Sequence, residues 1–538
     1  MKTVLGLIFL VGCADTDEGE GPPDPVSTVP TALDTCDRLG LPRVALQEGT
    51  GELRNEIAGD FSIPTTVGRW DFSDAFTGCD TYLFVPSIPA QEAGWDLDLW
   101  AEDGEELRGL LPENTHLFFV SVADDPAEVE ADLALVQDNV EQGMRKLPDD
   151  EEEALRARLH YVSEGVDDIA SWIGRALDDP GFGFGIDRTQ RIRDIGSLAD
   201  GERYSPAMGW FEPNLAHVAY EAVRYNWEAE RDAALAIDGA TVVTSHSRAL
   251  VEDSGWAGIR SYGDLRLPDA AEMAAFDTLE LDLTMDCDSD LEVGTADDPG
   301  CPDWDRIVEA FLCETDEVES CTIEAGRWIS AYHRNGRWVS DASFLLPMLR
   351  AGGLRKVAMY SIDPYVITLD WRFSTRGVPS PATSEVAWRA NASFDDTYPT
   401  NFPARQIAIP ADAEKVELTV VISGHGMSVP DNCAEFCDST HTFAVNGVEQ
   451  TISFPETADP EYCQNDVVNG TVANQYGTWF YGRSNWCPGK VVHPIVLDFT
   501  DAVTPGTDAE VTYTATGPNG VFPGGSNIDL SVFLTSRN

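Results

Sequence analysis

The segment VELTVVIS, residues 416–423, decides the fold of the larger part of the chain. Its apolar side chains fall on every second residue: Val416, Leu418, Val420 and Ile422. They therefore share one face of an extended strand. The same period of two recurs at 279–285 and 528–534, with Asn446-Gly447 among the turn signals that separate such runs. The chain from about residue 240 onward is thus predicted to be all-β, with two antiparallel sandwiches.

The linker between the two sandwiches is predicted at TRGVPSPATS, residues 375–384, where Pro, Gly, Ser and Thr interrupt the strand pattern. This boundary gives a first β domain over 240–376 and a second over 384–538. We expect each of them to form one antiparallel sandwich.

The chain before residue 240 has a different pattern, in which strands and helices alternate. Short apolar runs at 80–85 and 115–122 are of strand type, whereas 127–144 and 167–177 have helical spacing. A last helix is expected to start near Pro213, with a stripe that steps by three and four: Leu215, Val218, Ala222 and Tyr225. The region 35–236 is therefore predicted to be an α/β domain.

The stretches 59–85, 115–122 and 184–196 of this region resemble the thioredoxin and peroxiredoxin fold in their pattern. In that family the redox cysteines follow the strand that matches 80–85. Residues 86–100 contain no Cys. The resemblance therefore implies a thioredoxin-like domain that is redox-inactive and has a structural or accessory role.

Composition excludes some classes of partner. The 538 residues carry 93 acidic against 35 basic side chains, a net charge of −58, and 30 of the basic residues are Arg. Such a chain repels phosphate backbones and anionic membrane surfaces, so no nucleic acid partner is expected. The apolar content of 43% excludes disorder throughout. The acidity fits a high-salt habitat or plain solubility, and composition leaves both open.

The N-terminal residues 1–13, MKTVLGLIFLVGC, have the features of a signal peptide, with one Lys before an apolar run too short to span a bilayer. Residues 10–13 resemble the bacterial lipoprotein signal box, which implies lipidation of Cys13; an ordinary signal peptide is the alternative. The acidic, Pro- and Gly-rich stretch 14–34 suits a tether. We expect an exported bacterial protein, anchored to the outer membrane or cell surface only through its lipid.

Ten cysteines remain besides Cys13, an even number that favours disulfides in an oxidising compartment. No CxxC pair is present, which argues against zinc. Neighbouring cysteines suggest five pairs: Cys36–Cys79, Cys287–Cys301, Cys313–Cys321, Cys433–Cys437 and Cys463–Cys487.

Three segments combine carboxylates, arginines and aromatic rings: CPDWDR (301–306), ISGHGMSVPDNCAEFCDSTHTFAVNG (422–447) and QYGTWFYGRSNWCPG (475–489). Such combinations suit sugar sites, because rings stack on the CH faces of sugars while acids bind hydroxyl groups. Taken singly, each segment is also what a disulfide-bridged surface loop looks like.

Together the three segments resemble the peptide-N-glycosidase F family over about 240–538. That family removes N-linked glycans from glycoproteins and has two adjacent eight-stranded jelly rolls with the active site between them. The runs CAEFC…THT and WCPG carry the resemblance, and three family disulfides find counterparts in Cys287–Cys301, Cys433–Cys437 and Cys463–Cys487. The resemblance implies an amidase that hydrolyses the β-aspartyl-glucosamine bond, converts Asn to Asp, and needs no metal or cofactor.

The resemblance also implies the site residues. The family motif Cys-x-x-Trp-Asp-Arg is met by Cys301, Trp304, Asp305 and Arg306, which makes Asp305 the primary catalytic acid and gives Trp304 and Arg306 substrate contacts. Glu435 matches the second catalytic carboxylate. Arg483 and Trp486 match residues that contact the chitobiose core.

Two positions depart from the family pattern. A third family carboxylate, a Glu on a strand, aligns with Ile362, and Asp363 replaces it only if a bulge corrects the register. His425 stands at the position of a family Trp that contacts sugar. It either binds the glycan or only fills the space that the Trp would occupy. His441, which has a family counterpart, is expected to be structural.

Three alternatives remain. One is a catalytically degenerate, glycan-binding surface lipoprotein, which the two departures favour. Another is calcium in the acidic loop from Asp286 to Glu292, although Leu291 stands where an EF-hand requires Gly. A copper monooxygenase is disfavoured because no His-His or His-x-His pair is present. The partners expected for a monomeric amidase are N-linked glycoproteins or glycopeptides.

Overall fold

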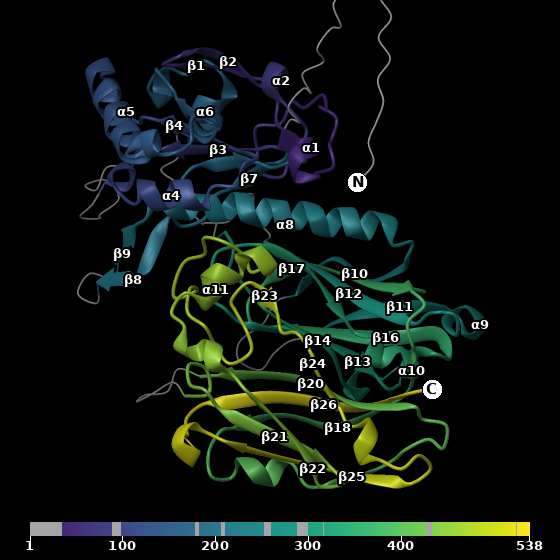
Figure 1. Ribbon diagram of the computed structural model, residues 1–538. Coiled ribbons are helices and arrows are strands. Elements are labelled where there is room, and N and C mark those ends of the chain that lie inside the picture. Colours follow the sequence, from purple (N-terminus) through teal and green to yellow (C-terminus); the bar gives the residue numbers. More distant parts are fainter. Residues whose placement is uncertain are drawn as a thin grey trace, which may run out of the picture.

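The structure is a computed structural model that describes residues 35–88, 98–177, 182–205, 210–251, 260–287, 300–315, 317–426, 433–522 and 524–538. It is a β-rich, multidomain protein with an α/β body at the N-terminal end and two β bodies after it (Figure 1). The expected signal peptide with Cys13, the tether 14–34, and Asp288, Asp290 and Glu292 of the acidic loop lie outside the described residues. None of the described helices has both the length and the apolar character that crossing a bilayer requires.

The N-terminal body is built on a five-stranded sheet in the order β5-β4-β3-β6-β7. Its strands are β3 (Thr81–Pro86), β4 (Thr115–Val120), β5 (Leu159–Tyr161), β6 (Phe184–Ile186) and β7 (Ile192–Asp194). The first three run parallel to one another, whereas β6 is antiparallel to β3 and β7 to β6. The two strands expected from sequence, 80–85 and 115–122, are the parallel pair β3 and β4.

Helices cover both faces of this sheet. They are α4 (Gly104–Leu110), α5 (Pro126–Glu141), α6 (Asp149–Arg156), α7 (Trp172–Leu177) and α8 (Val218–Ile237). Leu83 and Val85 point into the core formed with α4, α5 and α8, while Phe84, one residue between them, joins the core with α7. Each such buried side chain stabilises the fold by about 1.5–3 kcal/mol.

Smaller elements complete this body: α1 (Thr35–Leu39), α2 (Phe72–Ala75), the pair β1 (Ser62–Thr65) and β2 (Gly68–Asp71), and the pair β8 (Ala199–Ser205) and β9 (Trp210–Pro213). The disulfide Cys36–Cys79 joins α1 to the segment before β3.

The first β body has one sheet in the order β10-β17-β12-β15 and a second in the order β11-β16-β13-β14-β23. The strands of the first sheet are β10 (Thr241–Val251), β17 (Tyr365–Ser374), β12 (Thr278–Asp286) and β15 (Gly336–Asp341). Those of the second are β11 (Arg260–Asp269), β16 (Gly352–Ser361), β13 (Ile307–Cys313), β14 (Cys321–Ile329) and β23 (Lys490–Val491). One core contains Leu281 of β12 and Ala310 of β13, so the two sheets face each other.

The second β body repeats this arrangement with sheets β18-β26-β20-β24 and β19-β25-β21-β22. The strands of the first are β18 (Pro381–Ser393), β26 (Asn527–Arg537), β20 (Lys415–His425) and β24 (Ile495–Asp498); those of the second are β19 (Arg405–Ala408), β25 (Asp508–Thr516), β21 (Thr440–Val445) and β22 (Val448–Ser453). The alternating residues of 416–422 are all buried in the core between these sheets. Asn446 and Gly447, both with positive φ, form the β21–β22 turn.

The two β bodies are joined by a set of charges that is buried except for the partly buried Arg389, here called the interdomain cluster: Glu309, Glu324, Arg327, Arg389 and Asp529. Arg327 on β14 donates to Asp529 on β26 at 2.8 Å, and Arg389 on β18 donates to Glu309 on β13 at 2.7 Å. Burial, reinforced by the neighbouring Asp529, raises the pKa of Glu309 to about 8. The arginines thus bind the first body to the second.

Helix α8 lies between the N-terminal body and the first β body (Figure 1). Its Tyr225 belongs to the core of the N-terminal body, whereas Trp227 packs against the core of the first β body. Glu221 of α8 accepts a hydrogen bond of 2.7 Å from Arg334, which lies in the β14–β15 loop, and both side chains are buried. The helix is therefore part of both bodies.

The five disulfides predicted from the sequence are all present, including Cys287–Cys301, Cys313–Cys321, Cys433–Cys437 and Cys463–Cys487 of the β bodies. Three of them flank the segments that combine carboxylates, arginines and aromatic rings.

Candidate active site

Asp305 lies on a short loop that precedes β13. Ser330, just after β14, fixes this loop from both sides: its hydroxyl accepts a hydrogen bond from the backbone N–H of Arg306 and donates to the carbonyl of Trp304, each at 2.8 Å. The backbone of the loop is thus held on either side of Asp305, which limits the positions that its carboxylate can reach.

Glu435 lies on the loop closed by the Cys433–Cys437 disulfide, between β20 and β21. The loop packs directly on the end of β20, where a Cβ added to Gly424 would be 1.7 Å from the carbonyl oxygen of Ala434. Only glycine permits this approach. It also brings the N–H of Gly426 within 3.1 Å of Glu435 Oε2, to which it donates.

Arg483 connects the two carboxylates. Its Nε donates to Glu435 Oε1 at 3.1 Å, and its Nη2 is 3.4 Å from Asp305 Oδ2. The carbonyls of Thr478 and Tyr481 accept its remaining hydrogen bonds at 2.9 Å. Its side chain is 0% exposed. A single buried cation therefore holds Asp305 and Glu435 in one site, here called the carboxylate pair.

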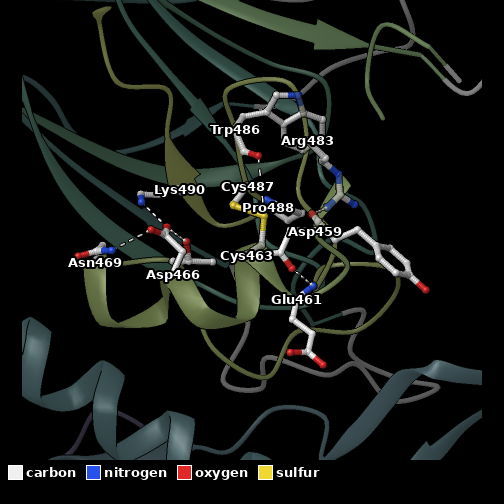
Figure 2. Close-up of a disulfide and its surroundings, with 12 residues drawn as sticks. Asp459, Glu461, Cys463, Asp466, Asn469, Arg483, Trp486, Cys487, Pro488 and Lys490 are labelled. Carbon is white, nitrogen blue, oxygen red and sulfur yellow. Dashed lines mark hydrogen bonds and ion pairs between the residues drawn. A yellow bond between two sulfur atoms is a disulfide. The ribbon is translucent and has the colours of Figure 1, made fainter. Parts of the chain in front are cut away.

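Aromatic rings enclose the guanidinium of Arg483. The rings of Phe436 and Trp486 lie 5.0 and 4.8 Å from it, within cation–π range. Trp486 is fixed by a 2.7 Å hydrogen bond from its indole to the carbonyl of Gly424. Figure 2 shows Arg483 and Trp486 on the segment that runs into Cys487, and the disulfide from Cys487 to Cys463 holds this segment against α11 (Tyr462–Asn465).

The location of Arg483 and Trp486 differs from the role that the family resemblance implies for them. Both are buried, Trp486 with only 5% of its surface exposed. As described, they shape and charge the carboxylate pair and do not offer a surface to a sugar.

The pKa values of both carboxyls are raised. Burial raises the pKa of Asp305 against the opposing charge of Arg483 and a hydrogen bond from the Tyr332 hydroxyl. Burial raises the pKa of Glu435 to about 7, again opposed by Arg483, while the charge of Asp305 adds to the rise. One cation between two carboxylates cannot stabilise both charges fully in this site, so the pair retains a proton near neutral pH.

The rim of the site is formed by exposed groups on the Asp305 loop. Trp304 is 51% exposed, and the Arg306 guanidinium lies 5.6 Å from its ring. Arg306 Nε is also 3.7 Å from Asp363 Oδ2. An exposed indole beside a cation and two carboxylates offers both a stacking face and hydrogen-bond partners.

The position of Asp363 corrects one sequence-based assumption. Sequence analysis treated Ile362 and Asp363 as strand residues, so that only a bulge turned Asp363 toward the site. β16 ends at Ser361 and β17 begins at Tyr365, so both residues lie in the turn between the strands. The alternation of faces does not apply in a turn, and Asp363 reaches Arg306 without a bulge.

His425 and His441 have separate roles. His425 stacks on Trp486 with ring centroids 5.0 Å apart and is 2.7 Å from the Ser423 hydroxyl; burial lowers its pKa to about 3. It therefore stays neutral and extends the aromatic wall. His441 is fully buried and bonds the Tyr513 hydroxyl at 2.7 Å, the structural role expected for it.

Sequence reasoning missed Tyr332, whose hydroxyl bonds Asp305 and lies 3.4 Å from that of Thr478. Neither residue stands in a motif, and only the fold brings the β14–β15 loop to the site. Within the described residues, the carboxylate group that could best hold a metal ion is Glu309, Glu324 and Asp529 of the interdomain cluster. Arg327 and Arg389 already compensate these charges. Asp286 of the acidic loop lies 3.6 Å from Arg248, an exposed cation.

Comparisons with known proteins found similar sequences and structures. Residues 393–532 match the family model of "Peptide-N-glycosidase F, C terminal". The peptide-N(4)-(N-acetyl-β-D-glucosaminyl)asparagine amidase F of Elizabethkingia miricola is 30% identical over 256 residues, a match that covers 41% of this chain and 66% of the relative, just under two thirds.

Two solved structures were also found. The PNGase F of Flavobacterium meningosepticum, described as a glycosylasparaginase, is 17% identical with a TM-score of 0.43, over 56% of this chain and 96% of its own. PNGF-II is 12% identical with a TM-score of 0.42, over 66% and 74%. The chain is thus similar in sequence to the peptide-N-glycosidase F family, with the family-model match on residues 393–532 of the second β body.

Proposed function

We propose that this protein is a peptide-N-glycosidase, an amidase that hydrolyses the bond between Asn and the first glucosamine of an N-linked glycan. The observation that carries the proposal is the carboxylate pair held by Arg483, with Nε 3.1 Å from Glu435 and Nη2 3.4 Å from Asp305. Asp305 and Glu435 are the two residues at which the family pattern has its catalytic carboxylates.

The proposed reaction needs one base and one acid. The base takes a proton from water as its oxygen attacks the amide carbon, and the acid gives a proton to the nitrogen as the C–N bond breaks. Asn becomes Asp, and a glycosylamine leaves, which then loses ammonia in water. Neither step requires a metal or a cofactor.

We divide the two roles between the carboxyls as follows. With a pKa of about 7, Glu435 is about half protonated at neutral pH, so we assign it the acid role. Asp305 faces Arg483 and Tyr332, which favour its charged form, so we assign it the base role. This reverses the sequence-based expectation that Asp305 is the acid. The two raised pKa values bring both groups closer to the operating pH, where acid–base catalysis is most efficient.

Substrate contacts are proposed for the exposed rim. Trp304 supplies a stacking face, and Arg306 and Asp363 supply hydrogen bonds. His425 and Trp486 together form the wall that stands where the family has two tryptophans. N-linked glycoproteins or glycopeptides are the proposed substrates, acted on by a monomer.

The test is the release of glycan from a defined glycopeptide, followed by mass spectrometry of the peptide. We expect release with conversion of Asn to Asp, and a loss of at least about 10²-fold in kcat/KM for Asp305→Asn. The matched control is Asp303→Asn, on the same loop, whose side chain is 66% exposed. Glycan binding with no conversion would instead favour the degenerate glycan-binding protein.

Two finer aspects of the fold are also proposals. The parallel pair β3–β4, with antiparallel β6 and β7 and a final helix α8, supports a thioredoxin-like N-terminal domain without redox chemistry. The paired antiparallel sheets of the β bodies support two jelly rolls. Export with lipidation of Cys13 is proposed as well, because five disulfides suit an oxidising compartment; mass spectrometry of the mature N-terminus tests it.

A further inference from the structure

A cleft of about 870 Å³ lies where the N-terminal body meets the first β body. Its walls come from three parts of the chain: the segments around residues 54 and 187–193 of the N-terminal body, one side of α8, and the ends of β12 and β15. It is separate from the carboxylate pair, none of whose residues line it.

The charge of this cleft is opposite to that of the molecule. Among the described residues, seven arginines and four carboxylates line it, and Asp194 and Asp282 outside the lining pair with Arg54 and Arg337, which leaves an excess of one positive charge. The whole chain has only 30 arginines and a net charge of −58. A quarter of the arginines of a strongly acidic protein thus gather around one cavity, where they raise the local concentration of anions.

The arginines of the cleft are not all neutralised by protein carboxylates. Arg188 is 2% exposed, and its Nη1 donates to the neutral amide oxygen of Asn226 at 3.4 Å. Its Nε has no hydrogen-bond partner among the described residues. Burial lowers the pKa of Arg188, because the surrounding charges do not fully replace its hydration.

Other arginines of the cleft contact neutral groups or share a partner. Arg191 is exposed and donates to the carbonyl of Asn55 at 2.8 Å. Arg54 and Arg248 both approach Asp286, at 3.7 and 3.6 Å. The guanidinium groups of Arg188 and Arg191 thus offer donor N–H groups to a ligand that carries an oxyanion.

The cleft adjoins the candidate active site through two short links. Asn335 lines the cleft, and Tyr332, three residues earlier, bonds Asp305; three residues span at most about 10 Å. Cys287 also lines the cleft, and its disulfide partner Cys301 begins the loop of Asp305. The short chain distances between the two sites support one branched glycan as the ligand of both.

We propose that the cleft binds an oxyanion group, a carboxylate or a sulfate ester, carried by a saccharide. Arg188 and Arg191 are the main contacts, and Arg54 and Arg248 supply further charge. The assignment of this saccharide to the substrate rests on the proposed amidase function, whereas the binding itself does not. The site makes the protein prefer acidic glycans.

Binding is tested first, by calorimetric titration of the full chain with sialyllactose, lactose and inorganic sulfate at low salt. We expect sialyllactose to bind, lactose to bind at least about tenfold more weakly, and the affinity for sialyllactose to fall as salt rises. Equal binding of lactose and sialyllactose would overturn the proposal. Sulfate that binds as tightly as sialyllactose would overturn the saccharide part and leave a site for free anions.

Variants locate the binding. Arg188→Gln is expected to lower the affinity for sialyllactose at least about tenfold, which corresponds to the loss of one charged hydrogen bond. Because Arg188 is buried, its replacement can also disturb folding. The double variant Arg191→Gln/Arg248→Gln changes only exposed side chains and is a second test, for which we expect the same loss of affinity. The matched control is Arg266→Gln, which should leave the affinity unchanged. Arg266 lies on β11, its side chain is 73% exposed, and it does not line the cleft. Unchanged affinity in both cleft variants would refute the assignment.

The link to the substrate is tested separately, with a sialylated glycopeptide and its desialylated form. We expect kcat/KM to be higher for the sialylated form, and this ratio to fall toward one in the double variant but not in Arg266→Gln. A ratio of one in the unmodified protein would overturn the substrate link. Absence of release from both glycopeptides would instead refute the amidase function, while the titration still decides whether the cleft binds acidic saccharides.

Discussion

The carboxylate pair with Arg483 and the interdomain cluster share an excess of one carboxylate over arginine, but their surroundings differ. Each has one more carboxylate than arginine: Asp305 and Glu435 around Arg483, and three acids around Arg327 and Arg389. Each also raises the pKa of one Glu, to about 7 at Glu435 and about 8 at Glu309. Excess carboxylate charge around a buried arginine is therefore not in itself a sign of catalysis.

The difference lies in access. The carboxylates of the interdomain cluster lie between strands of both β bodies and are at most 7% exposed, so that only the Arg389 side chain, at 20%, reaches the surface. The Asp305 side chain is 13% exposed and lies beside the exposed Trp304. A retained proton in the first case only balances charge, whereas in the second it can be passed to a ligand. The same substitutions made at both places separate these roles.

The largest expected effect is that of Arg327→Met. Removal of the cation leaves three buried carboxylates with Arg389 alone, which costs about 3–5 kcal/mol of the free energy of unfolding. Denaturant unfolding measures this loss. Arg266→Met, on the exposed face of β11, is the control and should change stability by no more than about 0.5 kcal/mol. Equal stability of the two variants would show that the cluster does not hold the β bodies together.

The matching substitution Arg483→Met is expected to cost less stability and more activity. Both carboxyls can take up protons when the cation is lost. The free energy of unfolding should therefore fall by only about 1.5–3 kcal/mol. Asp305 is then largely protonated near neutral pH, and kcat/KM should fall at least about 10²-fold, measured by glycan release. If Arg483→Met unfolds as readily as Arg327→Met, access does not distinguish the two places.

The pH dependence of activity sharpens the comparison further. If Glu435 acts as the acid, kcat/KM falls about tenfold per pH unit above about 7, where Glu435 loses its proton. Glu435→Gln cannot ionise, so this alkaline limb should vanish in the variant, at lower absolute activity. A limb that persists in Glu435→Gln belongs to another group and would refute the acid role.

The smallest effect is expected for Glu309→Gln. The folded protein keeps the Glu309 proton up to about pH 8, whereas the unfolded chain releases it near pH 4.5. Folded protein thus binds more protons within this window, so Glu309 lowers stability as the pH rises from about 4.5 to 8. Gln does not ionise, so the variant lacks this pH-dependent loss of stability. We expect the variant to gain stability relative to the parent as the pH rises from 5 to 8, measured by denaturant unfolding at both pH values. If the difference in free energy of unfolding between variant and parent is the same at both pH values, Glu309 does not hold the proton.

Sequence was sufficient for the elements whose pattern is local. The alternation of 416–422 predicted β20, and neighbouring cysteines predicted all five disulfides. The stripe from Leu215 to Tyr225 predicted α8, although the helix starts at Val218, after a 3-10 turn at 215–217, and not near Pro213. In each case a period or a short separation along the chain carries the information. The family motifs likewise predicted Asp305 and Glu435, which the fold brings to the same arginine.

Contacts between distant segments were beyond the reach of the sequence. The burial of Arg483, the hydrogen bond of Tyr332 and the arginine cleft each combine residues from several elements, and no local spacing marks them. Asp363 shows a second limit. Its role depended on whether the strand ended at Ser361, and the boundaries of elements are what sequence patterns specify least well.

The ion pair between Glu221 and Arg334 has an evolutionary consequence. Both side chains are fully buried, one in the N-terminal body and the other in the loop that carries Tyr332 to Asp305. A relative that loses the N-terminal body exposes or orphans Arg334, so gain or loss of that body should be accompanied by exchange at position 334. The presence of the Glu–Arg combination across genomes would thus record when the accessory body was acquired, independently of any similarity within that body.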